Sequence, residues 1–345
     1  MRAKQNVAIR QICAAIALAV VAVFGALASP ASAQTPAPIT MKLSTATVND
    51  TQHEWLKRFA AAVEKDSGGR IKGEIYPASQ LGTIPRQIEG TQFGAIQGWT
   101  GPPEFLVGVD ERYEALSAPG EFTGRAQYEG TIKDPAVLDM MLGLGANKGL
   151  IGGGIYPIGP SSILTKKPVQ HLSDYAGMKI RVLASPFQLE MIKRMGGSPV
   201  AMTLADVLPA LQQGALDGSL TTITQYTTLH YIDAGKYVVE TGQPYVSSMT
   251  VLSKKWVEGL PADLQKIVRD DAMKTSIDIM PYVDQFFDEQ RQVWQKSGGT
   301  LTSLPEADQA AMIAKISSIG EDLSKSKPDL DAAVKTVFAT AAKYK

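Results

Sequence analysis

The chain has 345 residues, of which 20% are charged, with 34 Lys and Arg against 34 Asp and Glu and a single cysteine. Without a basic excess or a basic run it offers no electrostatic footprint for nucleic acid or for an anionic membrane surface. One cysteine, Cys13, excludes an intrachain disulfide, and the length suggests about two domains at roughly 150 residues each.

The first 33 residues have the pattern of an export signal. Three basic residues, Arg2, Lys4 and Arg10, precede an uncharged and mostly apolar run at 12–28, and the Ala-Ser-Ala sequence at 31–33 has the small-residue form at which signal peptidase cleaves. An uncleaved membrane anchor is the alternative, because the run is near the minimum spanning length of roughly 17 residues. Cleavage would leave 312 of the 345 residues, with 31 basic and 34 acidic side chains and no cysteine. We therefore expect a periplasmic protein.

The first part of the mature chain alternates strands and helices. We expect strands at 41–47, 70–76 and 94–99 and helices at 53–65 and 84–93. Strands that alternate with helices in this way predict a parallel sheet covered by helices, and such sheets bind ligands at the carboxyl ends of their strands. The polar and aromatic side chains at these ends, Asn49, Gln97 and Trp99, are our first candidates for ligand contact.

The middle of the chain predicts a second domain. An irregular segment and a helix at 128–144 lead into a glycine-rich strand at 149–158, after which we expect the chain to cross over. Further elements are predicted as strands at 178–183 and 199–202, a helix at 186–195, another helix after Thr203, and extended segments at 236–241 and 245–253. The β-branched sequence at 218–225 predicts a strand or a loop after the tight Asp217-Gly218 turn.

The longest periodic run predicts a helix over 261–296, which Pro281 should kink. At 1.5 Å per residue this helix is roughly 50 Å long, so we expect it to span both domains. A strand at 300–304 and a helical tail from Glu306 complete the chain. We predict an α/β fold with domain I at 34–158 plus about 247–280, and domain II at 159–246 plus about 281–345.

Catalytic patterns are weak. The three histidines, His53, His171 and His230, lie far apart in unrelated settings, and no metal-binding, nucleophile-elbow or phosphate-loop spacing occurs. We therefore predict that the protein is not an enzyme, with no catalytic residues, no metal site and no cofactor. An exported hydrolase with a cryptic site and a structural envelope protein are distant alternatives.

Arg181 lies at the centre of the predicted strand 178–183, on the same side as Lys179. A buried guanidinium is costly unless it is paired. Its partner is either an internal carboxylate, such as Asp206 or Asp217, or the carboxylate of a ligand that it holds bidentately in a cleft. The strand alone leaves both possibilities open.

The residues around Arg181 resemble the solute-binding proteins of tripartite ATP-independent periplasmic (TRAP) transporters, of the C4-dicarboxylate-binding type. The similar stretches within the 45 residues from 174 to 218 are GMKIRV at 177–182, GGSPVAM at 196–202 and ALQQGALDG at 210–218. Shorter matches are SGGRI at 67–71, YPASQLG at 76–82, KKPV at 166–169 and WVEGLP at 256–261. The resemblance covers nearly all of residues 40–300, and the 45-residue run is its specific part.

The resemblance implies a periplasmic binding protein fold of the type II-like kind, with a hinge between two domains and a long helix over both. It implies that Arg181 holds an organic acid in the cleft and that the protein, a monomer or a homodimer, delivers this ligand to the membrane subunits of a TRAP permease. Trp99 and Tyr245 would then line the pocket.

Two departures from the family narrow the expected ligand. The family often continues Gln-Glu-Asn-Pro after Asp-Gly, where this chain has Ser-Leu-Thr-Thr at 219–222, and some members have a second arginine where this chain has Ser161. One fixed cation matches one carboxylate, so we expect a monocarboxylate with an aromatic or hydroxylated body, bound by Arg181 with Thr221, Ser161 and Gln225. A C4-dicarboxylate ligand and a binding protein of the ABC type are the alternatives.

Overall fold

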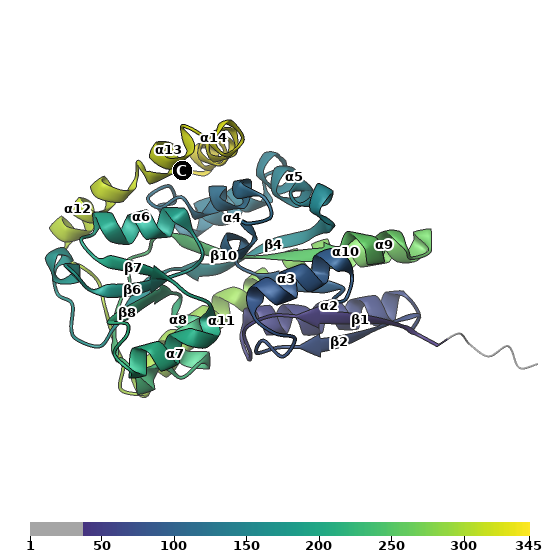
Figure 1. Cartoon of the computed structure of the whole chain (residues 1–345), viewed down its shortest axis with the longest axis horizontal. Helices are drawn as coiled ribbons and strands as arrows, with labels where there is room; N and C mark the ends of the chain where they lie inside the picture. Colours follow the sequence, from purple (N-terminus) through teal and green to yellow (C-terminus); the bar gives the residue numbers. More distant parts are fainter. Residues whose placement is uncertain (1–36) are drawn as a thin grey trace, which may run out of the picture. The chain divides into compact units, whose positions relative to one another are not determined.

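The computed structural model describes residues 37–345, so the expected signal segment lies outside the described residues. No helix within this range has the length and apolar character that crossing a membrane requires. Residues 38–345 cluster as one unit, in which two β-sheets are each packed against helices (Figure 1). Each sheet together with its helices is called a lobe below.

The first lobe contains a five-stranded sheet in the order β2-β1-β3-β10-β4. Its strands are β1 (Ile39–Ser44), β2 (Ile71–Tyr76), β3 (Gly98–Gly101), β4 (Leu150–Pro160) and β10 (Tyr245–Ser253). β1 pairs in parallel with β2 and β3, as predicted, whereas β10 is antiparallel to both β3 and β4. Helices α2 (Thr51–Asp66) and α3 (Ile84–Phe93) connect the parallel strands, and α2 buries Trp55, Phe59 and Val63 in the core.

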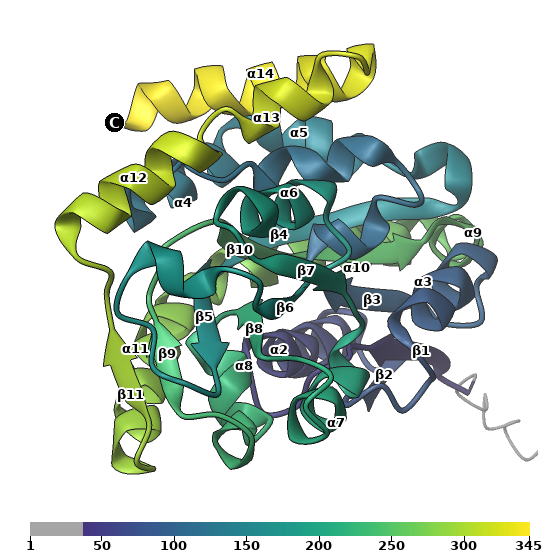
Figure 2. The ribbon, with the colours of Figure 1, turned by 60° about the vertical axis from the view of Figure 1, so that its left-hand side comes forward.

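The second lobe contains a six-stranded sheet in the order β11-β9-β5-β8-β6-β7. Its strands are β5 (Ser162–Thr165), β6 (Lys179–Val182), β7 (Ser198–Ala201), β8 (Gly218–Thr221), β9 (Tyr237–Val239) and β11 (Thr300–Thr302). β6 pairs in parallel with β7 and β8. The connecting helices are α6 (Pro186–Arg194), α7 (Leu204–Gln212) and α8 (Ile223–Thr228), and Figure 2 shows β6, β7 and β8 side by side.

The chain passes between the two sheets at three joints in the described part, and its carboxyl-terminal tail, described below, passes from the second lobe back to the first. β4 leads into β5 through Ser161 alone, β9 leads back to β10, and α10 (Ala262–Asp278) leads into α11 (Met280–Lys296) through Ile279. α10 packs against α2 and β4 of the first lobe. α11 packs mainly against α8 of the second lobe, and it also contacts β11 of the second lobe and β4 and α2 of the first. One long periodic segment therefore contacts both sheets.

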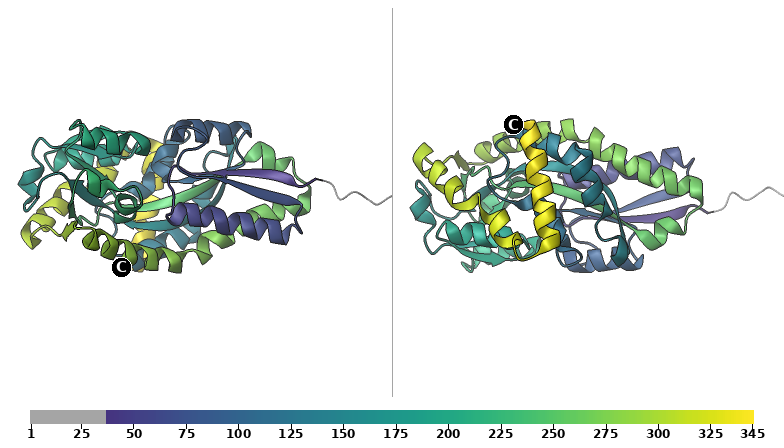
Figure 3. Two further views of the ribbon diagram at one scale, coloured as in Figure 1. Left: turned by 90° about the horizontal axis from the view of Figure 1, so that it is seen from below. Right: turned by 90° about the horizontal axis from the view of Figure 1, so that it is seen from above.

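The remaining helices cover the ends of the lobes. They are α4 (Arg125–Lys133), α5 (Pro135–Gly143), α9 (Lys254–Glu258), α12 (Glu306–Ile316), α13 (Ile319–Ser324) and α14 (Pro328–Ala341). The carboxyl-terminal tail packs first against α6, through α12 and α13, and then against α4 and α5, through α14. Figure 3 shows α14 as the yellow helix that crosses this surface.

The prediction of a strand or loop over 218–225 was wrong in its second half. β8 ends at Thr221, Thr222 has an extended backbone, and α8 follows. The β-branched residues of α8 are accommodated because the hydroxyls of Thr227 and Thr228 donate to backbone carbonyls one turn earlier in the helix.

Two predicted helices are each divided in the structure. The helix expected at 128–144 is α4 and α5, because Asp134 ends the first and caps the second, which Pro135 opens. The helix expected at 261–296 is interrupted at Ile279, two residues before Pro281, which lies in the first turn of α11. Proline is tolerated there because the first N–H groups of a helix have no intrahelical acceptor.

Candidate functional site

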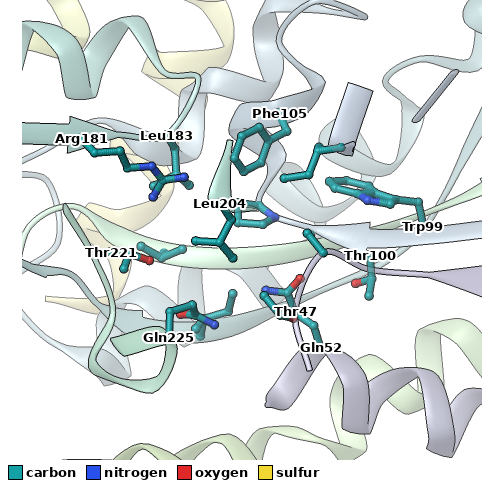
Figure 4. A pocket seen from close by; sticks show the side chains of 16 residues that line it. Thr47, Gln52, Trp99, Thr100, Phe105, Arg181, Leu183, Leu204, Thr221 and Gln225 are labelled. Carbon is teal, nitrogen blue, oxygen red and sulfur yellow. The ribbon is translucent and has the colours of Figure 1, made fainter. Parts of the chain in front are cut away.

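A cavity of about 410 Å³, including the open space at its mouth, is lined by both lobes. Apolar side chains form most of its wall, among them Trp99, Phe105, Ile158, Leu183 and Leu204. Figure 4 shows Leu183 beside Arg181 and Trp99 on the opposite side of the cavity. The arrangement suits a mostly apolar ligand with one charged end.

Arg181 projects from β6 into this cavity, and only 1% of the residue is exposed. Its Nε donates to the carbonyl oxygen of Met202 at 2.9 Å, and its Nη1 donates to the carbonyl oxygen of Leu220 at 3.3 Å. Burial lowers the pKa of Arg181, which nearby Tyr231, Tyr226 and Glu104 partly offset, but a guanidinium remains charged in proteins. The backbone contacts therefore orient a cation whose remaining donors are free.

The internal carboxylates that the sequence offered as partners do not bind this guanidinium. The Asp217 carboxylate accepts from the backbone N–H of Lys179 at 2.9 Å, and the Asp206 carboxylate accepts from the Thr203 hydroxyl at 2.8 Å. Within residues 37–345, Arg181 forms no ion pair, since its polar contacts are the two carbonyls. Burying a cation that has no ion-pair partner costs free energy unless an anion pairs with it.

Thr221 lines the cavity at the end of β8, where 5% of the residue is exposed. Its backbone N–H donates to the Tyr226 hydroxyl at 3.1 Å, which fixes the strand end. Its own hydroxyl has no hydrogen-bond partner among the described residues, so it is free to bind a ligand oxygen.

Two glutamines line the cavity in different states. Gln52, in the first turn of α2, accepts a hydrogen bond on Oε1 from the Thr45 hydroxyl at 2.9 Å, which leaves its amide N–H groups without an acceptor in the part of the chain described. Figure 4 shows this amide directed into the cavity. Gln225, on α8, donates from Nε2 to Asp50 Oδ2 at 3.0 Å and accepts on Oε1 from the Thr222 and Thr224 hydroxyls. The Gln52 amide can therefore donate to a ligand, whereas both polar atoms of the Gln225 amide already have partners in the protein.

Trp99 and Phe105 form the aromatic part of the wall, on the first-lobe side of the cavity (Figure 4). The Trp99 indole lies against Gly101, where an added Cβ would be 2.4 Å from the indole Cζ2. The absence of a side chain at Gly101 is thus what allows the indole its position in the wall.

Four of the eight residues predicted as ligand contacts, Arg181, Thr221, Trp99 and Gln225, line this cavity. The other four have structural contacts elsewhere. The Ser161 hydroxyl donates to the Gln243 carbonyl at the joint between β4 and β5. The Gln97 amide accepts from the backbone N–H of Lys42 at 2.8 Å and so ties β1 to the start of β3.

Asn49 and Tyr245 are also placed outside the cavity wall. Asn49 is exposed, with a φ of 55°, and its backbone N–H donates to His53 Nδ1 at 3.1 Å. Tyr245 stacks on Tyr128 with 5.0 Å between the ring centroids, and Phe122 packs edge-on against the Tyr245 ring.

Several wall residues were missed in the sequence, chiefly Thr47, Gln52, Phe105, Leu183 and Leu204. The strand-end rule that pointed to Asn49 applies equally to Thr47, which follows β1. Gln52 carried a weaker signal, because its direction depends on α2 beginning at Thr51, with Asp50 as the cap.

A family model described as bacterial extracellular solute-binding protein, family 7 (DctP), matches residues 43–326. The chain belongs to this family. It is 30% identical over 217 residues to the protein YiiZ of Salmonella typhimurium, an alignment that covers 63% of this chain and 66% of YiiZ. It is 26% identical over 247 residues to the C4-dicarboxylate-binding periplasmic protein DctP of Rhodobacter capsulatus, covering 70% of this chain and 72% of that protein.

The fold is similar to a TRAP periplasmic solute-binding protein from Desulfovibrio salexigens that has orotic acid bound. The TM-score is 0.83 at 22% identity, over 89% of this chain and 99% of that one. The predicted family and the predicted α/β binding-protein fold are thereby confirmed. Within this family the chain is a solute-binding protein, and its cavity is the candidate solute site.

Proposed function

We propose that this protein captures an organic acid with a single carboxylate and delivers it to the membrane subunits of a TRAP permease. The observation that carries the proposal is Arg181, a buried cation that two backbone carbonyls orient and that forms no ion pair with any carboxylate of the described residues. A guanidinium with free donors binds a carboxylate bidentately, and the pair satisfies both charges.

The rest of the wall supports one carboxylate over two. Arg181 is the only Lys or Arg in the cavity lining, and the other polar groups are neutral hydroxyls and amides. A second buried carboxylate would lack a cation, which costs several kcal/mol. The relative with bound orotic acid, which has one carboxyl group on a flat ring, supports this reading. The relative named for C4-dicarboxylate binding supports the alternative.

The neutral part of the ligand is proposed to be an aromatic ring or a body with carbonyl or hydroxyl groups. Trp99 and Phe105 offer flat surfaces for a ring. Gln52 offers amide N–H donors, and Thr221 offers a hydroxyl without a partner in the described residues. Each of these groups pairs with an oxygen on the ligand.

The two lobes are proposed as domains I and II of the expected hinge fold. We place the hinge at the three joints, Ser161, the segment between β9 and β10, and Ile279, and we propose that a hinge motion closes the lobes over the ligand. Export by a cleaved amino-terminal signal would put the protein in the periplasm, where the relatives named as periplasmic proteins act.

Thermal shift and calorimetry with a panel of acids test this function. We expect binding of orotate or other monocarboxylates and weak binding of succinate and malate. Arg181→Ala should abolish binding while the variant stays folded, whereas Lys179→Ala, which removes the exposed cation two residues away on β6, should leave binding unchanged. Strong binding of succinate with none of any monocarboxylate would overturn the proposed ligand class.

A further inference from the structure

A hydrogen bond joins the two lobes beside the cavity. Asp50 lies between β1 and α2 of the first lobe, and Gln225 lies on α8 of the second. Gln225 Nε2 donates to Asp50 Oδ2 at 3.0 Å, and the two residues are 4% and 1% exposed. The following inference rests on the proposed function, because it concerns how the same site closes and what it rejects.

The surrounding contacts leave the Gln225 amide one orientation. A carboxylate only accepts hydrogen bonds, so the Asp50 side chain requires the NH₂ group of Gln225 to face it. The Gln225 Oε1 then accepts from the Thr222 and Thr224 hydroxyls, the latter at 3.0 Å. Both polar atoms of the amide thereby have a partner in the protein, and Nε2 keeps a second N–H toward the cavity that Gln225 lines.

Asp50 is a negative charge buried directly behind the cavity wall. Its neighbours Thr47, Gln52 and Gln225 line the cavity. Its oxygens accept from neutral donors, namely the Thr47 and Gln225 side chains and the backbone N–H groups of Gln52 and His53, the last at 3.0 Å. Burial raises the pKa of Asp50 above its ordinary value, and these hydrogen bonds, which favour the charged form, offset part of that rise. No Lys or Arg of residues 37–345 forms an ion pair with it, so its charge acts on whatever fills the cavity.

The site is consequently polarised, with the cation of Arg181 on the second lobe and the anion of Asp50 on the first. We infer that Asp50 and Gln225 form a latch that forms when the lobes close, and that the Asp50 charge makes the closed site reject a second carboxylate. A ligand with one carboxylate leaves its neutral end near Asp50, whereas a dicarboxylate would place two negative charges close together in a buried site.

Single variants separate the two roles of the latch. Asp50→Asn keeps an oxygen to cap α2 through His53, but it replaces the charged acceptor with an NH₂ group, which Gln225 can pair with only by turning its amide over and losing the hydrogen bonds that Oε1 accepts from the Thr222 and Thr224 hydroxyls. We expect roughly 10- to 100-fold weaker binding of orotate, the loss typical of a buried hydrogen bond to a charged group. The preference for orotate over succinate should also fall by about tenfold, because the repelling charge is gone. Gln225→Leu should weaken orotate binding and keep the preference.

The decisive variant exchanges the carboxylate and the amide between positions 50 and 225. Asp50→Asn combined with Gln225→Glu lets the asparagine cap α2 with its oxygen and donate to the new carboxylate, which still accepts from the Thr222 and Thr224 hydroxyls. Both the hydrogen bond and the charge are restored with the partners reversed. We expect orotate affinity and the preference over succinate to return to within a few-fold of the natural chain. Thr227→Ala, on the same helix, is the matched control.

The measurements are calorimetric titrations with orotate and succinate. A double variant no better than Asp50→Asn, or an Asp50→Asn preference within twofold of the natural one, would overturn the latch while the natural chain still binds orotate. A natural chain that binds no acid of the panel would overturn the proposed function itself, and the latch with it.

Discussion

Two buried glutamates predict that stability falls as pH rises through neutrality. Glu114 accepts on Oε1 from the Ser185 hydroxyl and from the Phe187 backbone N–H at 2.8 Å, at the first turn of α6. Its other carboxyl oxygen has no partner in the part of the chain described. Burial raises the pKa of Glu114 to about 8, and burial likewise raises the pKa of Glu104, which accepts from Gln188, to about 7.

The sign follows from the ordinary glutamate pKa of 4.5 in the unfolded chain. Between this value and about 8, the folded protein holds a proton on Glu114 that the unfolded chain has lost. The stabilisation is therefore complete below pH 4.5 and is lost as pH rises toward 8. The slope is about 1.4 kcal/mol per pH unit for one proton, so Glu114 alone accounts for a loss on the order of 3 kcal/mol between pH 5.5 and 7.5.

Glu114→Gln isolates this contribution, because glutamine keeps the accepting oxygen and does not ionise. We expect the difference in free energy of unfolding between the variant and the natural chain to grow in favour of the variant by roughly 2–3 kcal/mol between pH 5.5 and pH 7.5. Urea unfolding at the two pH values measures both. Glu111→Gln is the control, since the Glu111 side chain is 41% exposed and pairs with Lys327.

A Glu114→Gln effect of equal size at both pH values would refute the reasoning, because it would show that packing and not ionisation separates the two proteins. A Glu111→Gln variant with the same pH dependence as Glu114→Gln would refute it as well.

Two glycines give further predictions. Gly101→Ala places a Cβ 2.4 Å from the Trp99 ring, so the indole must move from its place in the cavity wall. We expect orotate binding at least tenfold weaker by calorimetry, and an unchanged affinity would contradict the assigned position of the ring. Gly154→Ala places a Cβ 2.1 Å from the Ser276 hydroxyl, between β4 and α10. We expect the free energy of unfolding in urea to fall by about 1–3 kcal/mol, and we expect Ser276→Gly to restore part of this loss. A loss that Ser276→Gly leaves unchanged would point to a different clash.

The sequence predicted the elements best where one signal dominates. Period-two alternation predicted β1, and helical spacing between clear breaks predicted α2, α3 and α6 to within a few residues. α8 was missed because Thr224, Thr227 and Thr228 have the composition of a strand, and the contacts of the Thr227 and Thr228 hydroxyls with backbone carbonyls of the helix are visible only in the fold.

The residues of the candidate site were likewise predictable only where a strong local signal marks them. Arg181 was predictable because a cation at the centre of an apolar strand is costly and therefore informative. The pairing of Asp50 with Gln225 was not, because 175 residues separate them and neither has a local pattern that requires the other. Predicting that Gln52 faces the cavity required knowing at which residue α2 begins, and helix ends are the least certain part of any such prediction.

The placement of β10 between β3 and β4 also constrains how the chain folds. β10 pairs Thr250 with Thr100 on one side and Met249 with Ile155 on the other. β10, an interior strand of the first sheet, is therefore synthesised after β5, β6, β7, β8 and β9 of the second sheet. The amino-terminal segment must wait, with an unpaired β3 edge, for about 150 further residues, so its closure has high contact order and is expected to be slow. The second sheet is likewise incomplete until β11 arrives, and neither lobe finishes folding before the chain has passed through the other.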